Sequence, residues 1–313
     1  MNTRPLGRSG LHIAPLVFGS NVFGWTADEA RSFALLDRFV ERGFNTIDTA
    51  DVYAAWAPGL AGGESETIIG RWLARRGRRD DVIVMTKVAK WQPRKGLSAA
   101  NIEAAVEDSL RRLRSDHIDV YFAHEDDASV PLEETLAAFD RLVRAGKVRA
   151  LGASNYGPER VLEALRIAAR EGLARYEVLQ PGYNLLDRGF ETTLAPVARE
   201  QGLGVVAYFA LASGFLTGKY RRIEDLEGSS RAGFLRHCFD ARGLRVLASL
   251  REVAEELAAT PAQVALAWLM AKPAVSAPIA SATSLAQLDD LMAAAELVLP
   301  AEATSRLDNA ASA

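Results

Sequence analysis

The sequence predicts a single α/β domain folded as a (β/α)8 TIM barrel, in which each of eight parallel strands is followed by a helix. Amphipathic helical segments alternate with short segments of branched and aromatic residues, and the connections between them are brief. Eight such short segments can be counted, which is enough to close a barrel. An open dinucleotide-binding sheet would need a GxGxxG-type turn after its first strand, and the stretch FGSNVFGW lacks one.

The elements follow one another in a regular order from residue 1 to residue 313. The N-terminal stretch TRPLGRSGLHI places a glycine-containing turn between two extended runs, which predicts a β-hairpin across the bottom of the barrel. The eight strands are expected at 15–19, 44–47, 82–88, 118–123, 148–153, 177–180, 204–209 and 274–280. Helices are expected at 28–43, 65–77, 101–113, 132–146, 158–172 and 190–202. Residues 212–240 and the tail from Leu297 interrupt the alternation and are interpreted as long functional loops.

Composition and charge exclude several classes of function. Hydrophobic residues make up 49% of the chain and charged residues 25%, as in ordinary globular domains. The net charge of −3 argues against a nucleic-acid partner. Cys238 is the only cysteine, so an internal disulfide is impossible and a reducing compartment fits. Without a signal-peptide pattern or an apolar run of membrane length, we expect a cytoplasmic protein with no membrane partner. Nothing in the sequence indicates an oligomeric state.

Polar side chains stand at the carboxyl ends of the predicted strands, where a barrel builds its ligand site. In chain order they are Asp48, Tyr53 in the following loop, Lys87, His124, Ser154, Asn155, Gln180 and Tyr208. Taken singly, each has a structural explanation: Asp48 and Asp51 as helix caps, Lys87 as a side chain extending to water, and His124 as a hydrogen-bonded structural residue. A metal site is not expected at His124, because no second histidine lies at a suitable spacing. The convergence of four reactive residue types on one rim nevertheless favours a chemical site.

The chemistry of these four residue types is complementary. A free tyrosine has a pKa of about 10, and an adjacent ammonium group favours the phenolate. We therefore expect Lys87 to lower the pKa of Tyr53, and Asp48 to keep Lys87 charged and oriented. His124 is expected to hydrogen-bond a carbonyl oxygen that lies within reach of Tyr53. The set predicts proton transfer to the oxygen of a reacting carbonyl group.

The chain resembles the aldo-keto reductase superfamily over essentially its whole length, and within it a bacterial branch similar to the potassium-channel β subunits. The similar stretches are NTIDTADVY, GGESETIIGRWL, VMTKV, PLEETLAAFDRLVRAGKVRALGASNY, LQPGYNLLDR and GFLTGKY. The resemblance implies a (β/α)8 barrel that binds NADPH, with NADH as an alternative, extended across the strand ends. It also implies the reversible reduction of a small aldehyde or ketone to the alcohol.

The resemblance implies a role for each site residue. Tyr53 would be the general acid, Lys87 and Asp48 its tuning pair, and His124 the residue that orients the carbonyl group. Ser154, Asn155 and Gln180 would hold the nicotinamide carboxamide, with Tyr208 stacked on the ring. Residues 211–219 are similar to a loop that covers the pyrophosphate, and residues 279–290 to a segment that wraps the adenosine. The cofactor contacts implied outside the nicotinamide pocket are Gly19, Ser20, Asp48, Leu211, Ser213, Gly214, Lys219, Ser281, Thr283, Gln287 and Asp290.

Two loop tryptophans, Trp56 and Trp91, are candidate walls of the substrate site, although a loop tryptophan is as often a packing anchor.

Three departures from the family pattern concern the choice of cofactor. Phe209 begins a stretch where many members have Ser-Pro-Leu, so a serine hydroxyl contact to phosphate is either lost or supplied by Ser213. Leu291 replaces an asparagine, and the segment around Ser281 lacks the lysine and arginine of NADPH-specific members.

Two alternatives to a carbonyl reductase remain open from the sequence. One is an NAD(P)-dependent alcohol or sugar dehydrogenase that uses the same residues in the oxidative direction. The other is a cofactor-sensing binding subunit without significant turnover, similar to the potassium-channel β subunits. Those subunits have asparagine at the position of His124, so the histidine favours turnover here.

Overall fold

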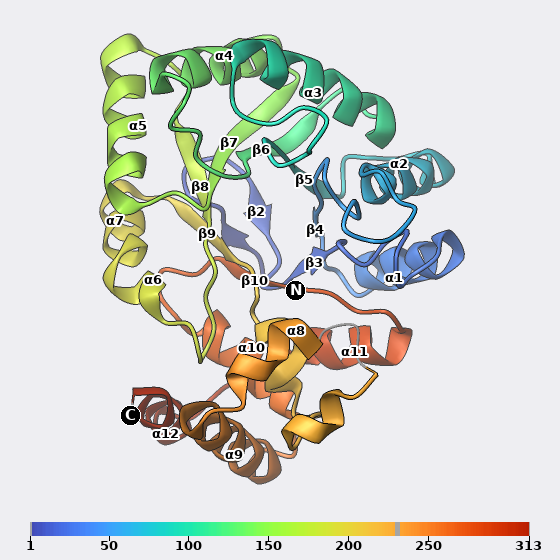
Figure 1. Cartoon of the computed structure of the whole chain (residues 1–313), viewed down its shortest axis with the longest axis vertical. Helices are drawn as coiled ribbons and strands as arrows, with labels where there is room; N and C mark the ends of the chain where they lie inside the picture. Colours follow the sequence, from blue (N-terminus) through green and yellow to red (C-terminus); the bar gives the residue numbers. More distant parts are fainter. Residues whose placement is uncertain (1, 229–231, 313) are drawn as a thin grey trace.

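The computed structural model describes residues 2–228 and 232–312, and it contains a closed barrel of eight parallel strands (Figure 1). The strands run around the barrel in the order β10-β3-β4-β5-β6-β7-β8-β9. Their bounds are β3 Val17–Gly19, β4 Thr46–Asp48, β5 Ile83–Val88, β6 Ile118–Ala123, β7 Val148–Ser154, β8 Tyr176–Gln180, β9 Gly204–Ala207 and β10 Ala277–Ala280. The predicted (β/α)8 barrel is confirmed.

The N-terminal hairpin closes the bottom of the barrel, as predicted. β1 (Arg4–Pro5) pairs antiparallel with β2 (His12–Ile13). Leu6, at its turn, is fully buried against side chains from the barrel interior. Gly7 has φ +58°, and a Cβ atom there would lie 2.5 Å from the carbonyl oxygen of Glu177. Only glycine permits this close approach of the hairpin to the strand ends.

A ring of amphipathic helices covers the outside of the barrel (Figure 1). The first seven are α1 Glu29–Glu41, α2 Glu64–Arg76, α3 Ala99–Leu113, α4 Leu132–Arg144, α5 Pro158–Glu171, α6 Gly189–Thr192 and α7 Leu194–Gln201. The sequence predicted one helix where α6 and α7 are separate. Pro196 explains the break, because it lacks an amide hydrogen and its ring crowds the carbonyl group four residues earlier.

The C-terminal third is more helical than predicted. The described residues between 212 and 240 include four short helical segments, namely η1 Ala212–Thr217, η2 Ile223–Leu226, α8 Ala232–Leu235 and η3 Arg236–Cys238. Three longer helices follow, α9 Ala241–Glu256, α10 Pro261–Met270 and α11 Leu285–Ala293, and then the short η4 Ala294–Glu296. The tail, interpreted from sequence as a loop, contains α12 Ala301–Ser312, which lies beside α9 (Figure 1). Asp308 fixes α12 to the end of α10 by accepting hydrogen bonds from Trp268 Nε1 at 3.0 Å and from Lys272 Nζ at 3.1 Å.

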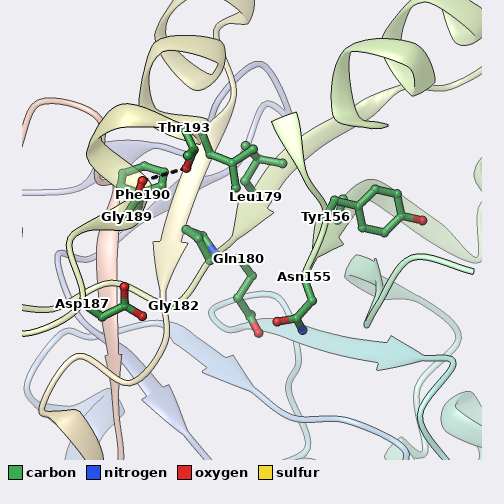
Figure 2. A pocket seen from close by; sticks show the side chains of 12 residues that line it. Asn155, Tyr156, Leu179, Gln180, Gly182, Asp187, Gly189, Phe190 and Thr193 are labelled. Atoms are coloured by element: carbon green, nitrogen blue, oxygen red, sulfur yellow. Dashed lines mark hydrogen bonds between the residues drawn. The ribbon is translucent and has the colours of Figure 1, made fainter. Parts of the chain in front are cut away.

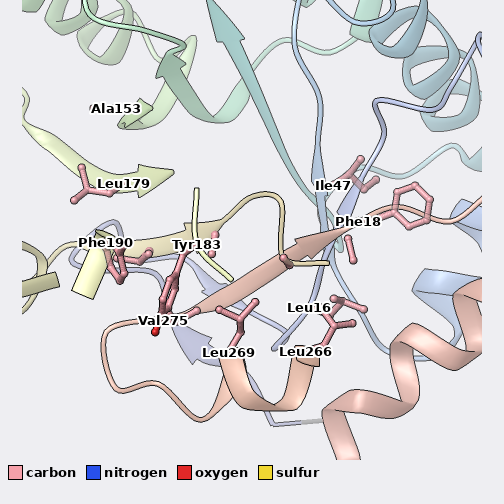
Figure 3. Packing of buried hydrophobic residues seen from close by; sticks show 14 of the residues in the cluster. Leu16, Phe18, Ile47, Ala153, Leu179, Tyr183, Phe190, Leu266, Leu269 and Val275 are labelled. Atoms are coloured by element: carbon pink, nitrogen blue, oxygen red, sulfur yellow. The ribbon is translucent and has the colours of Figure 1, made fainter. Parts of the chain in front are cut away.

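Buried apolar side chains form two layers. The inner layer fills the lower barrel and includes Met85, Val120 and Val206 together with the hairpin. The outer layer lies between the strands and the helices; Figure 3 shows part of it, where Leu16 and Phe18 lie near Leu266 of α10. Packing on both sides holds the strands rigidly, so the residues at their carboxyl ends have fixed positions.

Candidate active site

The carboxyl ends of β4 and β5 bring Asp48, Tyr53 and Lys87 together. Lys87 is fully buried, and its Nζ donates to Asp48 Oδ2 at 2.8 Å, to the Thr49 carbonyl oxygen at 2.7 Å and to the Tyr53 hydroxyl oxygen at 3.0 Å. The Tyr53 hydroxyl lies 3.4 Å from Asp48 Oδ2. The lysine therefore contacts both the carboxylate and the phenol, as predicted.

The loop that carries Tyr53 is folded around a carboxylate that the sequence analysis did not identify. Glu64 accepts hydrogen bonds from the backbone N–H groups of Ala54 at 3.3 Å, Ala61 at 2.8 Å and Gly62 at 2.9 Å. Trp91 Nε1 donates to the carbonyl oxygen of Ala61 at 2.7 Å. Trp91 is thus an anchor for this loop. The available signal was an acidic residue directly after two glycines at the start of a predicted helix.

The electrostatics of Tyr53 differ from the sequence prediction. Burial raises the pKa of the Tyr53 hydroxyl well above its ordinary value, and the negative charge of Asp48 adds to this effect. Burial also lowers the pKa of Lys87, although Asp48 opposes that change. The expected lowering of the Tyr53 pKa is therefore wrong for this structure, because desolvation outweighs the attraction of the ammonium group. Tyr53 is a protonated donor at neutral pH.

His124 follows β6 and faces Tyr53, with ring centroids 6.2 Å apart and the rings nearly perpendicular. Burial lowers the pKa of its imidazole well below 6.5, and the charges of Lys87 and Lys90 act in the same direction. The ring is therefore neutral. Its Nδ1 is buried without a hydrogen-bond partner. A neutral imidazole beside the phenol is suited to donating one hydrogen bond to a substrate oxygen.

The ends of β7 and β8 supply the residues predicted to hold a nicotinamide carboxamide. Gln180 Nε2 donates to Asp48 Oδ1 at 2.7 Å, which links the end of β8 to the end of β4. The Tyr208 hydroxyl donates to Asn155 Oδ1 at 2.7 Å, and the Ser154 hydroxyl donates to the Gln180 carbonyl oxygen at 2.9 Å. A cavity of about 250 Å³ opens beside Asn155 and Gln180. Figure 2 shows both amide side chains directed toward the same side of this pocket.

The segment predicted to wrap the adenosine follows β10. The Ser281 hydroxyl donates to Asn21 Oδ1 at 2.6 Å, and the Thr283 hydroxyl donates to Gln287 Oε1 at 3.1 Å. A Cβ atom on Gly19 would lie 2.7 Å from Ser281 Oγ, so the ends of β3 and β10 approach closely. Arg31 of α1 donates to the Thr283 carbonyl oxygen at 3.4 Å. This places a guanidinium beside a segment that has no basic residue of its own.

Asp290 and Ser20 have structural partners. Asp290 accepts from Gln263 Nε2 at 2.8 Å and from the Thr260 hydroxyl at 3.0 Å, and it thereby ties α10 to α11. Ser20 is buried and donates to the Asp48 carbonyl oxygen at 2.7 Å.

The predicted pyrophosphate loop has an unusual backbone. Ala212, Ser213 and Gly214 have φ values of 45°, 57° and 103°, three consecutive residues in the left-handed region. The N–H groups of Ala212 and Gly214 donate to the carbonyl oxygens of Phe209 and Leu211, each at 2.8 Å, so both are used within the turn. The loop borders a second cavity of about 400 Å³ lined by Phe209, Ser213, His237 and Arg242 among others. Lys219, at the end of the loop, lies over the ring of Tyr220 at 4.7 Å.

Comparisons with known proteins agree with this geometry. The model of the aldo/keto reductase family matches residues 15–312. The chain belongs to the aldo/keto reductase family. It is 35% identical over 315 residues to the uncharacterized oxidoreductase YrpG of Bacillus subtilis (strain 168), which covers 97% of this chain and 94% of the relative.

Two further relatives of this aldo/keto reductase carry different names. A probable voltage-gated potassium channel subunit beta of Arabidopsis thaliana is 33% identical over 314 residues, covering 95% of this chain and 92% of the relative. The aldo-keto reductase dtxS3 of Metarhizium robertsii (strain ARSEF 23 / ATCC MYA-3075) is 32% identical over 331 residues, covering 92% and 85% respectively.

Aromatic side chains border the opening of the site in this aldo/keto reductase. Trp56 is 48% exposed and packs edge-on against Tyr53, with centroids 5.6 Å apart. Trp25, which the sequence analysis did not identify, packs edge-on against Trp56 at 6.0 Å. On the β9 side, Phe209 is 57% exposed and packs against Tyr208 at 4.9 Å.

Across residues 2–228 and 232–312, no cluster of three or more acidic, histidine or cysteine side chains is arranged to hold a metal ion. In the same part of the chain, no helix combines the length and the apolar character needed to cross a bilayer.

Proposed function

We propose that this oxidoreductase of the aldo/keto reductase family reduces an aldehyde or ketone to the alcohol, with NADPH or NADH as the hydride donor and Tyr53 as the general acid. The observation that carries the proposal is the contact of the Lys87 ammonium group with both the Tyr53 hydroxyl at 3.0 Å and Asp48 at 2.8 Å. A buried lysine paired in this way has no role in packing alone. Its function is electrostatic, and it acts on the phenol.

Each residue at the rim has a separate role in the proton transfer. The neutral imidazole of His124 donates a hydrogen bond to the carbonyl oxygen and holds it near Tyr53. A reduced nicotinamide, when bound, would supply the hydride to the carbonyl carbon. As that C–H bond forms, the Tyr53 hydroxyl gives its proton to the oxygen, and the product is the alcohol. The phenolate left behind faces Lys87, and Asp48 keeps the ammonium group in place.

The residues present fit a dinucleotide lying across the strand ends. The amides of Asn155 and Gln180 line a cavity and have the donors and acceptors that a carboxamide requires. At the adenosine end, Gln287 and the Arg31 guanidinium favour the 2′-phosphate of NADPH.

The opening of the site favours a neutral, apolar carbonyl substrate. Trp56 and Trp25 form an aromatic wall beside Tyr53. The lysine that follows β5 near the opening, Lys90, lies 3.5 Å from Glu125, so its charge is already balanced. An aldehyde with an aromatic or branched apolar substituent is therefore expected to bind better than a carboxylate-bearing one.

The test is Tyr53→Phe, assayed with a panel of aldehydes and both reduced cofactors by nicotinamide absorbance. We expect cofactor binding to be retained and turnover to fall by about 10² to 10⁴, because the ring remains while the proton donor is lost. A variant that keeps more than about half of the parental rate would exclude Tyr53 as the acid. Cofactor binding by the parent without turnover of any carbonyl would instead favour a cofactor-sensing binding subunit; the Arabidopsis relative is named as a probable potassium channel subunit.

A further inference from the structure

Asp51 is a second carboxyl group in the Tyr53 loop, and the proposed proton transfer does not use it. It lies three residues beyond the end of β4, and its backbone N–H donates to the Lys87 carbonyl oxygen at 3.3 Å. The side chain is 2% exposed, and neither carboxyl oxygen has a well-formed hydrogen bond. An acidic group so buried and without donors is costly when ionised.

A buried polar cluster surrounds this carboxyl group. Glu66 of α2 is fully buried and accepts from the Thr86 hydroxyl at 2.6 Å and from Arg112 Nε at 2.7 Å. Tyr121, which pairs with Thr86 across β5 and β6, has a buried hydroxyl without a partner. Five other charged or titratable groups interact electrostatically with Asp51. They come from its own loop, α2, β5, α3 and β6, and are in that order Tyr53, Glu66, Lys87, Arg112 and Tyr121.

The cluster contacts both ends of the loop that carries Tyr53. Asp51 begins this loop. At the other end, a Cβ atom on Gly62 would lie 3.0 Å from the Asp51 carbonyl oxygen, and one on Gly63 would lie 2.6 Å from the Arg112 side chain. Gly63 N donates to the Tyr53 carbonyl oxygen at 2.9 Å, which closes the loop. A displacement of Asp51 therefore moves the segment that places Tyr53.

The protonation state of Asp51 changes near neutral pH. Burial raises the pKa of Asp51 to about 7, and the negative charge of Glu66 adds to this effect, while Arg112, the Val52 N–H and Lys87 oppose it. Arg112 is already paired with Glu66. The ionised form of Asp51 thus has no cation of its own within the cluster.

We propose that Asp51 is a positioning residue: when it is neutral the loop stays packed and Tyr53 lies against Lys87, and when it is ionised the loop loosens and Tyr53 leaves Lys87. The effect on turnover rests on the proposed function, whereas the effect on the loop does not. The folded-state pKa of about 7 exceeds the unfolded value of about 3.9. Asp51 protonation therefore contributes stability that is complete below about pH 4 and is lost as pH rises through about 7.

The experiment compares the parent chain with Asp51→Asn and Glu66→Gln, using two measurements. Tryptophan fluorescence of the cofactor-free protein reports the loop, because Trp56 packs on Tyr53 and Trp91 holds Ala61. The pH profile of kcat for aldehyde reduction reports Tyr53 placement. In the parent, both should change with a midpoint near 7, and kcat should fall about tenfold per pH unit above it.

The two variants should respond in different ways. Asp51→Asn should show no transition near neutrality in either measurement, because its amide does not titrate. Glu66→Gln should move the midpoint to lower pH, since removing a neighbouring negative charge favours ionised Asp51. Asp119→Asn is the matched control: Asp119 is fully buried but lies at the other end of β6, paired with Arg79 and Arg149, and its loss should leave the midpoint unchanged.

The inference would be overturned if Asp51→Asn still showed the change in fluorescence or kcat near pH 7, or if Glu66→Gln raised the midpoint of that change. If Glu66→Gln does not fold, Arg112→Gln replaces it with the opposite expected shift, to higher pH. A parent that reduces no carbonyl but shows the Asp51-dependent fluorescence change would contradict the proposed function and leave this inference standing. Normal carbonyl turnover with no change in fluorescence or kcat near pH 7 would contradict this inference and leave the proposed function standing.

Discussion

Replacement of Lys87 by methionine is the sharpest test of the charge arrangement at the active site. Methionine nearly preserves the volume of the lysine stem, so the fully buried position remains filled. The substitution removes three hydrogen bonds, to Asp48, to the Thr49 carbonyl oxygen and to the Tyr53 hydroxyl. It also leaves the Asp48 carboxylate without its cation, 3.4 Å from the phenol.

The size of the effect follows from the 3.0 Å separation of Lys87 Nζ and the Tyr53 oxygen. At an effective dielectric constant of about 20, an ammonium group and a phenolate at that distance attract by about 5.5 kcal/mol. The attraction exists only after the proton has begun to leave, so it stabilises the transition state more than the ground state. Its loss corresponds to about four powers of ten in rate. We expect kcat to fall by about 10³ to 10⁴.

The assay follows nicotinamide absorbance with a good aldehyde substrate over a range of pH, after thermal melting has shown that the variant is folded. Lys90→Met is the matched control, because Lys90 is a half-exposed lysine near the same opening, and it should change kcat less than about threefold. Removal of the ammonium group should also raise the pKa of Tyr53 further. A folded Lys87→Met variant with more than about a tenth of the parental kcat would refute the assigned role of Lys87.

Four further substitutions test the surroundings of the site. Glu64→Ala removes the acceptor for three backbone N–H groups of the Tyr53 loop; it should lower kcat by about tenfold or more with little change in global stability, measured by kinetics and thermal melting. The preference for NADPH over NADH should stay below about a hundredfold; Gln287→Arg should widen it and Arg31→Ala should narrow it, measured as ratios of kcat/KM. Asp308→Ala should lower the melting temperature by several degrees without changing kcat, because it releases α12 from Trp268 and Lys272.

The fold was predictable because its strongest signals are local. Each βα unit carries its own alternation of branched strand residues and amphipathic helix, so the barrel order could be read along the chain. The prediction was less accurate after β9, where α9 and α10 occur in succession. α10 is buried on nearly all sides, so its residues show no polar stripe that would indicate a helix. The break at Thr193 depended on a single proline, Pro196.

The convergence of the candidate catalytic residues was predictable for a related reason. Asp48 and Lys87 lie in the last two residues of their strands and His124 directly follows its strand, and a closed barrel must bring those ends together. Glu64 could not be identified in this way, because its three hydrogen-bond donors come from a folded loop. Arg31 lies 252 residues from Thr283 in the chain, and only the closure of the barrel makes them neighbours. Such contacts require the tertiary structure.

The pKa of Tyr53 is raised in the structure, whereas the sequence predicted that it would be lowered. The sequence showed the ammonium group of Lys87 but not the degree of burial, and burial determines the pKa of the resting phenol. In the resting site Asp48 and Lys87 form one balanced pair, and Tyr53 remains neutral. In the proposed reaction, a negative charge arises on Tyr53 only as its proton moves to the substrate oxygen. The low-polarity surroundings that disfavour the phenolate at rest also strengthen its attraction to Lys87 at that moment. Burial of these three side chains thus protects the proton donor before the reaction and increases the effect of Lys87 during it.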